Sequence, residues 1–173
     1  MITISGVDPS SRKVAITTTF EGSDAPEMEV FKLPQDHTKG CGLAFRQVAE
    51  YFSLLKEAGH TPFCFLEEPF VGPNPRSIMA QCKIQGAVLA ACEEMLVPVV
   101  EVHNMTWKAQ LIGGRVDKPK ITRWVRKNWR DAYEMAYGDQ DLMDSAAINR
   151  WGKMQLAPKK KIIIRRARVA SHA

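Results

Sequence analysis

The sequence lacks the features that would place it in a membrane, in a secretory pathway or among zinc proteins. No apolar run in its 173 residues approaches the roughly 20 residues that a bilayer-spanning helix needs. The first ten residues, MITISGVDPS, have no basic segment, so we expect no secretory signal. There is no Cys-x-x-Cys pair, and no histidine lies at zinc-ligand spacing. We therefore expect a cytoplasmic protein with no membrane partner, in which the four cysteines are small buried apolar residues.

Negative charge is scarce in two parts of the chain. Residues 1–107 hold 8 basic and 13 acidic residues, whereas residues 108–130 hold 8 basic residues and 1 acidic residue. The last 15 residues hold 6 basic residues and no acidic ones, and the whole chain has a formal net charge of +5. This distribution indicates an acidic body with a basic segment and a basic tail, which favours a polyanionic partner.

The pattern of apolar residues predicts an α/β protein. Alternation predicts strands near residues 2–7, 14–18 and 28–33, and continuous apolar runs predict buried strands near 63–66 and 97–102. Helical spacing predicts helices near residues 40–58, 77–95, 105–112, 117–136 and 140–154. We expect one mixed five-stranded sheet with helices on both faces, formed by residues 1–157, followed by a basic tail at 158–173.

Acidic residues stand at the ends of two of these strands and at the start of the last helix. Asp8 ends the first strand, Glu67 ends the fourth, and Asp141 and Asp144 lie three residues apart on the last helix. Ligand sites of open sheets form beyond strand ends, so these groups are expected to meet at one edge. Crowded carboxylates need a cation, and oxygen ligands suit Mg²⁺ or Mn²⁺. Two such ions about 4 Å apart are a common arrangement for cutting a phosphodiester.

Each acidic residue also has a simpler explanation. Asp8 precedes Pro9 and is suited to starting a turn, and Glu67 is suited to a solvated strand end. The aspartates at the start of the last helix are suited to capping it. Their joint placement favours the metal site over these separate explanations.

Three sequence motifs resemble those of RuvC-type Holliday junction resolvases. Residues 4–12 (ISGVDPSSR) resemble their opening strand, and residues 65–70 (FLEEPF) resemble their second acidic motif. Residues 141–148 (DLMDSAAI) are similar to their closing helix. The resemblance covers residues 2–152 and implies an RNase H-like fold. Ser10, where that family usually has glycine, and the additional Asp139 point to a divergent, phage-type member, which implies the host cytoplasm for a phage-encoded protein.

The resemblance also implies roles for individual residues. Asp8, Glu67, Asp141 and Asp144 would be the catalytic residues, binding Mg²⁺ (or Mn²⁺), with two ions in each active site. Lys108 and Lys118 fall where the family has active-site lysines. Lys118 is the expected catalytic lysine, with Lys120 as the alternative.

The same resemblance implies a partner and an assembly. Phe70 matches an aromatic residue that contacts the centre of the DNA junction. Paired cuts need two active sites and therefore a homodimer, and the small residues between Gly86 and Ala91 are the candidate interface.

The basic segment is the expected DNA-binding surface. In the expected helix at 117–136, Lys120, Arg123, Lys127 and Arg130 share one face, and one-sided charge favours contact with phosphates over a solvated helix face. The candidate DNA-binding residues are Arg12, Phe70, Arg76, Lys108, Arg115, Lys118, Lys120, Arg123 and Lys127. The basic tail is a further candidate for contact with phosphates, or a solubility tail.

Three functional hypotheses remain from the sequence. The first is a metal-dependent endonuclease that resolves Holliday junctions and other branched DNA by paired phosphodiester hydrolysis. The second is an RNase H-like nuclease that acts on flaps or RNA–DNA hybrids. The third is a non-catalytic DNA-binding protein with the same fold, which the set of four acidic residues disfavours.

Overall fold

The structure is a computed structural model in which residues 1–69, 73–114 and 116–157 are described. A five-stranded sheet has the strand order β3-β2-β1-β4-β5. The strands are β1 (Ile2–Pro9), β2 (Lys13–Phe20), β3 (Pro26–Lys32), β4 (Thr61–Glu67) and β5 (Val99–Val102). Strands β1, β4 and β5 are parallel to one another, and the first three strands pair in antiparallel fashion. The mixed sheet expected from the sequence is confirmed.

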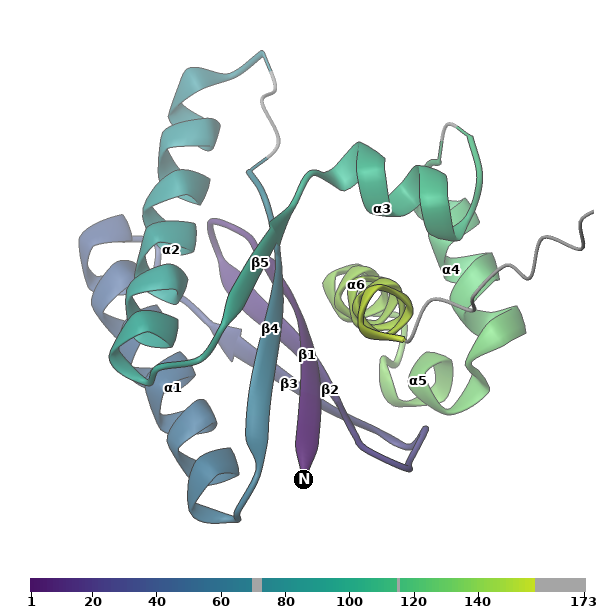
Figure 1. Ribbon diagram of the computed structural model, residues 1–173. Coiled ribbons are helices and arrows are strands. Elements are labelled where there is room, and N and C mark those ends of the chain that lie inside the picture. The colour runs from purple at the N-terminus through teal and green to yellow at the C-terminus, as the bar shows by residue number, and fades with distance from the viewer. Residues whose placement is uncertain (70–72, 115, 158–173) are drawn as a thin grey trace, which may run out of the picture.

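Helices cover both faces of this sheet (Figure 1). The helices are α1 (His37–Glu57), α2 (Pro75–Glu94), α3 (Asn104–Leu111), α4 (Lys118–Asn128), α5 (Arg130–Met135) and α6 (Gln140–Leu156). Helices α1 and α2 pack on one face, and α6 crosses the other face with α3, α4 and α5 outside it. None of the described helices is long and apolar enough to cross a membrane.

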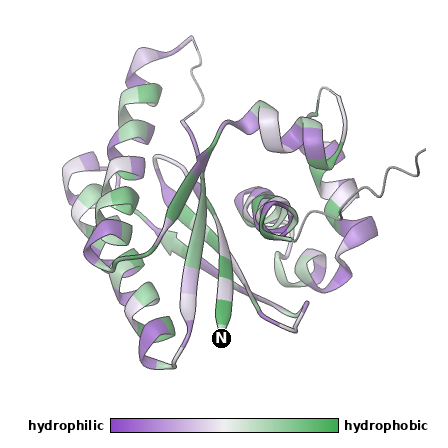
Figure 2. Cartoon of the chain, viewed as in Figure 1, coloured by the Kyte–Doolittle hydropathy of each residue, from purple (hydrophilic) through white to green (hydrophobic). Residues whose placement is uncertain are grey.

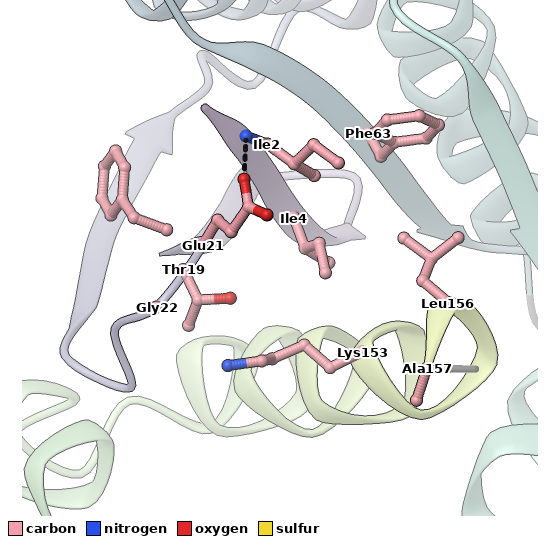
Figure 3. Close-up of a pocket in the computed structure, with 10 residues that line it drawn as sticks. Ile2, Ile4, Thr19, Glu21, Gly22, Phe63, Lys153, Leu156 and Ala157 are labelled. Carbon is pink, nitrogen blue, oxygen red and sulfur yellow. Dashed lines mark hydrogen bonds between the residues drawn. The ribbon is translucent and has the colours of Figure 1, made fainter. Parts of the chain in front are cut away.

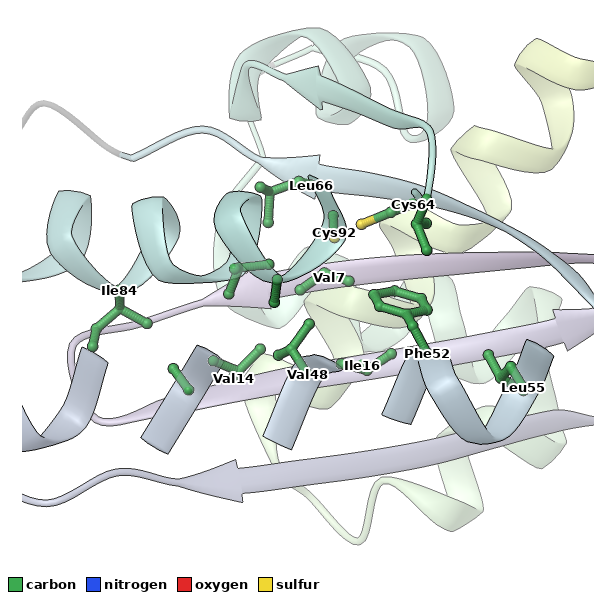
Figure 4. Packing of buried hydrophobic residues seen from close by; sticks show 14 of the residues in the cluster. Val7, Val14, Ile16, Val48, Phe52, Leu55, Cys64, Leu66, Ile84 and Cys92 are labelled. Carbon is green, nitrogen blue, oxygen red and sulfur yellow. The ribbon is translucent and has the colours of Figure 1, made fainter. Parts of the chain in front are cut away.

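The central strands are buried on both faces, so their side chains divide between two apolar cores. Val7 and Leu66 point towards α1 and α2, where Val48, Phe52 and neighbouring residues complete the first core (Figure 4). Phe65, the neighbour of Leu66 in the sequence, points to the opposite face and joins the second core with α4, α5 and α6. Because alternate strand residues face opposite sides, Asp8 and Glu67 point towards the α6 face.

Helix α6 lies unusually close to the sheet because glycines stand at two points of contact. A Cβ atom on Gly6 of β1 would overlap the backbone of Ser145 and Asn149 in α6. A Cβ atom on Gly152 of α6 would overlap the ring of Phe65 in β4. The buried Asn149 then donates through Nδ2 to the carbonyl oxygens of Ile4 at 2.6 Å and Thr17 at 3.0 Å. These contacts fix α6, and with it the acidic residues at its start, over β1 and β2.

Two expectations from the sequence are wrong. The single helix expected at 117–136 is two helices, because Trp129 leaves helical geometry with φ −153° and ψ 77°. Its indole N–H donates to the Asp24 carbonyl oxygen at 2.9 Å, a tertiary contact that local helix preference does not include. The cysteines are not all buried, since Cys64 and Cys92 are buried, Cys41 is half-buried and Cys82 is exposed on α2.

The α6 face of the sheet is incompletely covered at the end far from Asp8. There, an apolar groove of about 380 Å³ lies between the starts of β1 and β4 and the end of α6. Figure 3 shows Ile2, Ile4 and Phe63 on the sheet side of this groove and Leu156 on the helix side. Figure 2 shows hydrophobic and hydrophilic residues side by side along the helices that cover the sheet. The groove is remote from the acidic residues and is not part of the candidate active site.

Candidate active site

The first two acidic residues of the candidate site lie side by side at the carboxyl end of the parallel strands. Val7 of β1 pairs with Leu66 of β4, so the next residues, Asp8 and Glu67, are neighbours across the strand pair. Burial and the charge of the neighbouring Glu67 raise the pKa of the Asp8 carboxyl group. Both are buried, with 7% of Asp8 and 8% of Glu67 exposed. A buried carboxyl pair is an unusual strand end and excludes the simple explanation of a solvated turn.

The other two acidic residues come from the start of α6. Asp139 is the N-cap residue of this helix and accepts hydrogen bonds from the backbone N–H groups of Asp141 at 2.9 Å and Leu142 at 3.3 Å. Asp141 lies in the first turn and is partly exposed, and Asp144 follows one turn later and is buried. The helix spacing therefore presents both carboxyl groups on the side that faces β1 and β4.

The four carboxyl groups form one electrostatic cluster. Burial, followed by the charges of Glu67, Asp144 and Asp141, raises the pKa of Asp8 well above its usual value. Burial and the charge of Glu67 raise the pKa of Asp144 to about 7, against opposing contributions from a Gln140 hydrogen bond and from Lys108 and Lys118. The cluster holds more negative charge than its surroundings compensate. The structure thus brings together all four residues, and their role as metal ligands stays a prediction.

Nitrogen donors already hold three of the four carboxyl groups. Trp107 Nε1 donates to Glu67 Oε1 at 3.0 Å, and Gln140 Nε2 donates to Asp144 Oδ1 at 2.8 Å. Lys13 Nζ lies 3.2 Å from Asp141 Oδ2. Among the described residues, no three acidic, histidine or cysteine side chains are arranged to hold a metal ion. The oxygen donors and the excess negative charge fit a hard cation.

The expected active-site lysines lie at the edge of the cluster. Lys108 Nζ is 3.9 Å from Glu67 Oε1 and 4.9 Å from the centre of the Trp107 ring. Lys118, at the start of α4, is exposed, and its charge offsets part of the rise in the pKa of Asp144. Lys120 Nζ instead reaches the Gly113 carbonyl oxygen at 3.4 Å. The charge of Lys118 therefore acts on Asp144, and the choice between Lys118 and Lys120 as the catalytic lysine stays a prediction.

The remaining candidate DNA-binding residues occupy several exposed positions. Arg12 lies in the turn after β1, Arg76 lies in the first turn of α2, and Arg123 and Lys127 lie on α4. Phe70, Arg115 and the tail lie outside the described residues. The break at Trp129 shows that the expected position of Arg130 on this surface is wrong. Arg130 belongs to α5, where its Nε contacts Glu134 Oε1 at 2.7 Å, and does not continue the face formed by Arg123 and Lys127.

Sequence reasoning missed three residues that contact the acidic cluster. They are Lys13, Trp107 and Gln140, and none of them belongs to the three motifs. Lys13 contacts residues more than 120 positions away, and no periodicity or motif identifies such a partner. The only signal was the charge itself, since Lys13 stands at the start of a strand that otherwise contains no charged residue.

Comparisons of both sequence and structure with known proteins find similarity to RuvC. No protein-family model matches the chain. The crossover junction endodeoxyribonuclease RuvC of Polynucleobacter necessarius subsp. necessarius is 35% identical over 63 residues, or 36% of this chain. That alignment spans 38% of the length of the Polynucleobacter protein.

The similarity in structure extends over most of the chain. A structure of Thermus thermophilus RuvC has a TM-score of 0.67 and 25% identity, with 88% of this chain and 96% of that chain covered. A structure described as T. thermophilus RuvC in complex with a Holliday junction substrate has a TM-score of 0.70 and 23% identity, with 90% of this chain and 94% of that chain covered. The RNase H-like fold expected from the sequence is confirmed, as is the resemblance to RuvC.

Proposed function

We propose that this chain, a homologue of the RuvC-type Holliday junction resolvases, is a metal-dependent endonuclease that cuts branched DNA. The observation that carries the proposal is the convergence of Asp8, Glu67, Asp141 and Asp144 from two strand ends and one helix. Gathering four carboxyl groups, three of them buried, lowers the stability of the fold, and such a cost is typical of a functional site. A structural role does not account for an Asp8 carboxyl whose pKa is raised by burial and then by three neighbouring acids.

The proposed metal is Mg²⁺, for which Mn²⁺ can substitute, with two ions in each active site. The four carboxyl groups supply only oxygen donors, which this class of cation prefers. Such ions, when bound, activate water and stabilise the leaving oxygen of a phosphodiester. Trp107 keeps Glu67 facing the cluster through its 3.0 Å hydrogen bond. Lys108 and Lys118 supply positive charge beside Glu67 and Asp144, where a phosphate group and its developing charge would lie.

The proposed DNA-binding surface surrounds this cluster. Lys118 and Lys120 lie at the start of α4, and Arg123 and Lys127 extend along the same helix. Arg12 and Arg76 follow β1 and open α2, next to the same carboxyl edge of the sheet. Phe70 and Arg115 belong to this proposal from their positions in the sequence. Phosphate contacts of this kind position DNA without reading its sequence.

A homodimer is part of the proposal because two symmetric cuts need two active sites. Of the small residues between Gly86 and Ala91, Ala91 packs in the first core and Ala87 is half-buried. The candidate interface is therefore the exposed side of α2. Gly86 and Ala90 are exposed, as are Cys82 and Met79, one and two turns before Gly86. Light scattering of the wild-type protein and of Ala90→Glu measures the mass directly. We expect a dimer for the first and a monomer for the second.

The test of the proposed function is cleavage of a four-way junction by the purified protein in Mg²⁺, with a linear duplex as the control DNA. We expect paired nicks in the junction, none after addition of EDTA, and none with Asp8→Asn. Asp8→Asn should still bind the junction in a gel-shift assay. The matched control is Asp36→Asn, which retains a side chain able to cap α1 far from the cluster.

Competing substrates distinguish the alternatives within the same assay. Faster cleavage of a flap or an RNA–DNA hybrid than of the junction would assign the chain to the second hypothesis. Binding without any metal-dependent cleavage would assign it to the third. Retained cleavage in Asp8→Asn would contradict the proposed ligand set.

A further inference from the structure

Lys13 joins the β1–β2 hairpin to the start of α6. Its Nζ atom lies 2.8 Å from Asp139 Oδ1, 2.7 Å from Asp139 Oδ2 and 3.2 Å from Asp141 Oδ2. The ammonium group therefore bridges the residue that caps α6 and one of the proposed metal ligands. All three side chains are partly buried, with 27% of Lys13, 31% of Asp139 and 19% of Asp141 exposed.

The hairpin turn fixes the position from which this lysine reaches α6. Ser10 Oγ accepts from the Lys13 backbone N–H at 3.1 Å, and the Ser10 backbone N–H donates to the Lys13 carbonyl oxygen at 2.8 Å. Lys13 precedes Val14, which pairs with Pro9, so it stands two residues before the partner of Asp8 in the antiparallel register. Val14 faces the core formed with α1 and α2. Because successive strand residues face opposite sides, the Lys13 side chain lies on the α6 side of β2.

Asp139 has two separate functions in this arrangement. Its Oδ1 atom caps the backbone N–H groups of Asp141 and Leu142, which a serine or asparagine side chain can also do. Its negative charge, in addition, accepts both close contacts of the Lys13 ammonium group. Without that charge, Asp141 is the only carboxylate among the three residues that remains for Lys13 to pair with.

We propose that Lys13 is a positioning residue that competes with the metal ion for Asp141, and that Asp139 weakens this competition by sharing the ammonium group with Asp141. The inference rests on the proposed metal-binding function of Asp141. The Lys13 ammonium group and a divalent cation at Asp141 repel each other, so the contact of Lys13 with Asp141 Oδ2 opposes metal binding there. Asp139 then retains Lys13 and compensates its charge. The nitrogen partner of Asp141 in the structure is thus a built-in competitor of the cation.

Two substitutions should change metal affinity in opposite directions. Lys13→Met removes the competitor and should tighten Mn²⁺ binding at least about threefold, the scale of a partly exposed ion pair. Asp139→Ser keeps the helix cap, directs Lys13 to Asp141, and should weaken Mn²⁺ binding by at least about the same factor. In the double variant, Asp139→Ser should have no further effect, because the lysine is absent.

The experiment is isothermal titration of the full chain with Mn²⁺ in the absence of DNA, which is independent of cleavage. Lys32→Met is the matched control, since Lys32 is the register partner of Lys13 on β3 and is exposed. Its affinity should equal that of the wild type. Circular dichroism checks folding, and Lys13→Gln replaces Lys13→Met should the latter fail to fold.

Equal or weaker binding by both neutral variants of Lys13 overturns the inference, because a merely structural contact predicts loss in every variant. A wild type that binds Mn²⁺ while Lys13→Met does not bind it more tightly therefore contradicts this inference alone. A wild type that binds no Mn²⁺ contradicts the proposed function as well.

Discussion

The indole N–H of Trp107 donates to Oε1 of Glu67 over 3.0 Å, inside a site where both side chains are buried. Trp107 belongs to α3 and Glu67 ends β4, so this one hydrogen bond orients a carboxylate from the sheet through a helix that follows it in the chain. Lys108, the next residue of α3, lies over the same indole ring and beside the same carboxylate. The carboxylate of Glu67 is therefore positioned by α3 as well as by its own strand.

Trp107→Phe should lower junction cleavage without unfolding the protein. Phenylalanine keeps most of the buried apolar surface but leaves Glu67 without its neutral donor, at a cost of about 1–3 kcal/mol in the free energy of unfolding. Loss of a residue that orients a metal ligand typically costs about tenfold to a hundredfold in activity. The initial rate of junction cleavage and the denaturant midpoint measure both effects. The matched control is Trp151→Phe, because Trp151 Nε1 donates to Gln110 Oε1 at 2.8 Å outside the acidic cluster. Equal loss of activity in both variants would contradict the role of Trp107.

The metal-free protein should become less stable as the pH rises. The folded-state pKa of Asp144 is about 7, because of burial and the charge of Glu67, whereas an unfolded aspartate titrates near about 4. Between these values the folded state binds more protons than the unfolded state, so the free energy of unfolding falls with rising pH. Burial raises the pKa of Asp8 and adds to the effect in the same direction. In EDTA, thermal unfolding at about pH 8 should therefore occur at a lower temperature than at about pH 5.5.

Asp144→Asn should remove part of this pH dependence. In EDTA at about pH 8 we expect a higher melting temperature than for the wild type, by about 2–4 °C for each kcal/mol of repulsion relieved, together with loss of cleavage in Mg²⁺. The control is Asp131→Asn, an exposed residue of α5. A melting temperature of Asp144→Asn at or below that of the wild type would show that the charged Asp144 carboxylate does not destabilise the metal-free protein.

Gly152→Ala should destabilise the fold, because the new Cβ atom overlaps the Phe65 ring. That ring cannot move freely, since it packs edge-on against Trp151 with ring centres 5.7 Å apart. Overpacking of this kind costs about 1–3 kcal/mol. Gly42→Ala in α1 is the matched control, because its Cβ atom meets only Arg46 Nη1 at 3.5 Å, an ordinary contact. There we expect stability to be unchanged or raised by up to about 1 kcal/mol, as for alanine in place of glycine inside a helix. Urea unfolding of the two variants compares them.

Removing two charges from α4 should change how junction binding depends on salt. For Arg123→Gln combined with Lys127→Gln, the slope of log Kd against log salt should fall by about 2, since each lost phosphate contact removes roughly 0.9. Lys32→Gln combined with Lys39→Gln removes the same charge from exposed positions on β3 and α1. An equal change of slope in the control would mean that net charge, and not the α4 surface, determines binding.

Much of the fold follows from local patterns in the sequence. Alternation identifies β1 and β2, and a continuous apolar run identifies β4, because their side chains fill two cores on opposite faces. Trp129 shows where such reasoning ends. Residues 117–136 have helical spacing throughout, and the break depends on contacts with Asp24 and with Arg150, whose guanidinium lies 3.9 Å from the centre of a Trp129 ring. Those partners are distant in the sequence.

The candidate site likewise has one part that the sequence predicts and another that it does not. Strand ends and helix spacing predict which acidic residues can meet, because β-sheet geometry and the helical repeat determine where Asp8, Glu67 and Asp144 point. They do not predict the nitrogen donors. Trp107, Gln140 and Lys13 reach the acidic groups from three elements, and each contact depends on how those elements pack. The catalytic and metal-binding roles of the four acidic residues remain predictions that the variants above test.

The order of the elements along the chain also has a consequence for synthesis in the cell. Asp8 and Glu67 belong to the first 67 residues, but Asp141 and Asp144 belong to α6, the last described helix. A growing chain that has not yet reached residue 140 contains Asp8 and Glu67 but lacks Asp141 and Asp144. It also lacks α6, the helix that packs over Gly6. The complete set forms only after α6 has been translated and has packed on β1 and β2. On the proposed function, an incomplete or truncated translation product that ends before α6 cannot cut DNA.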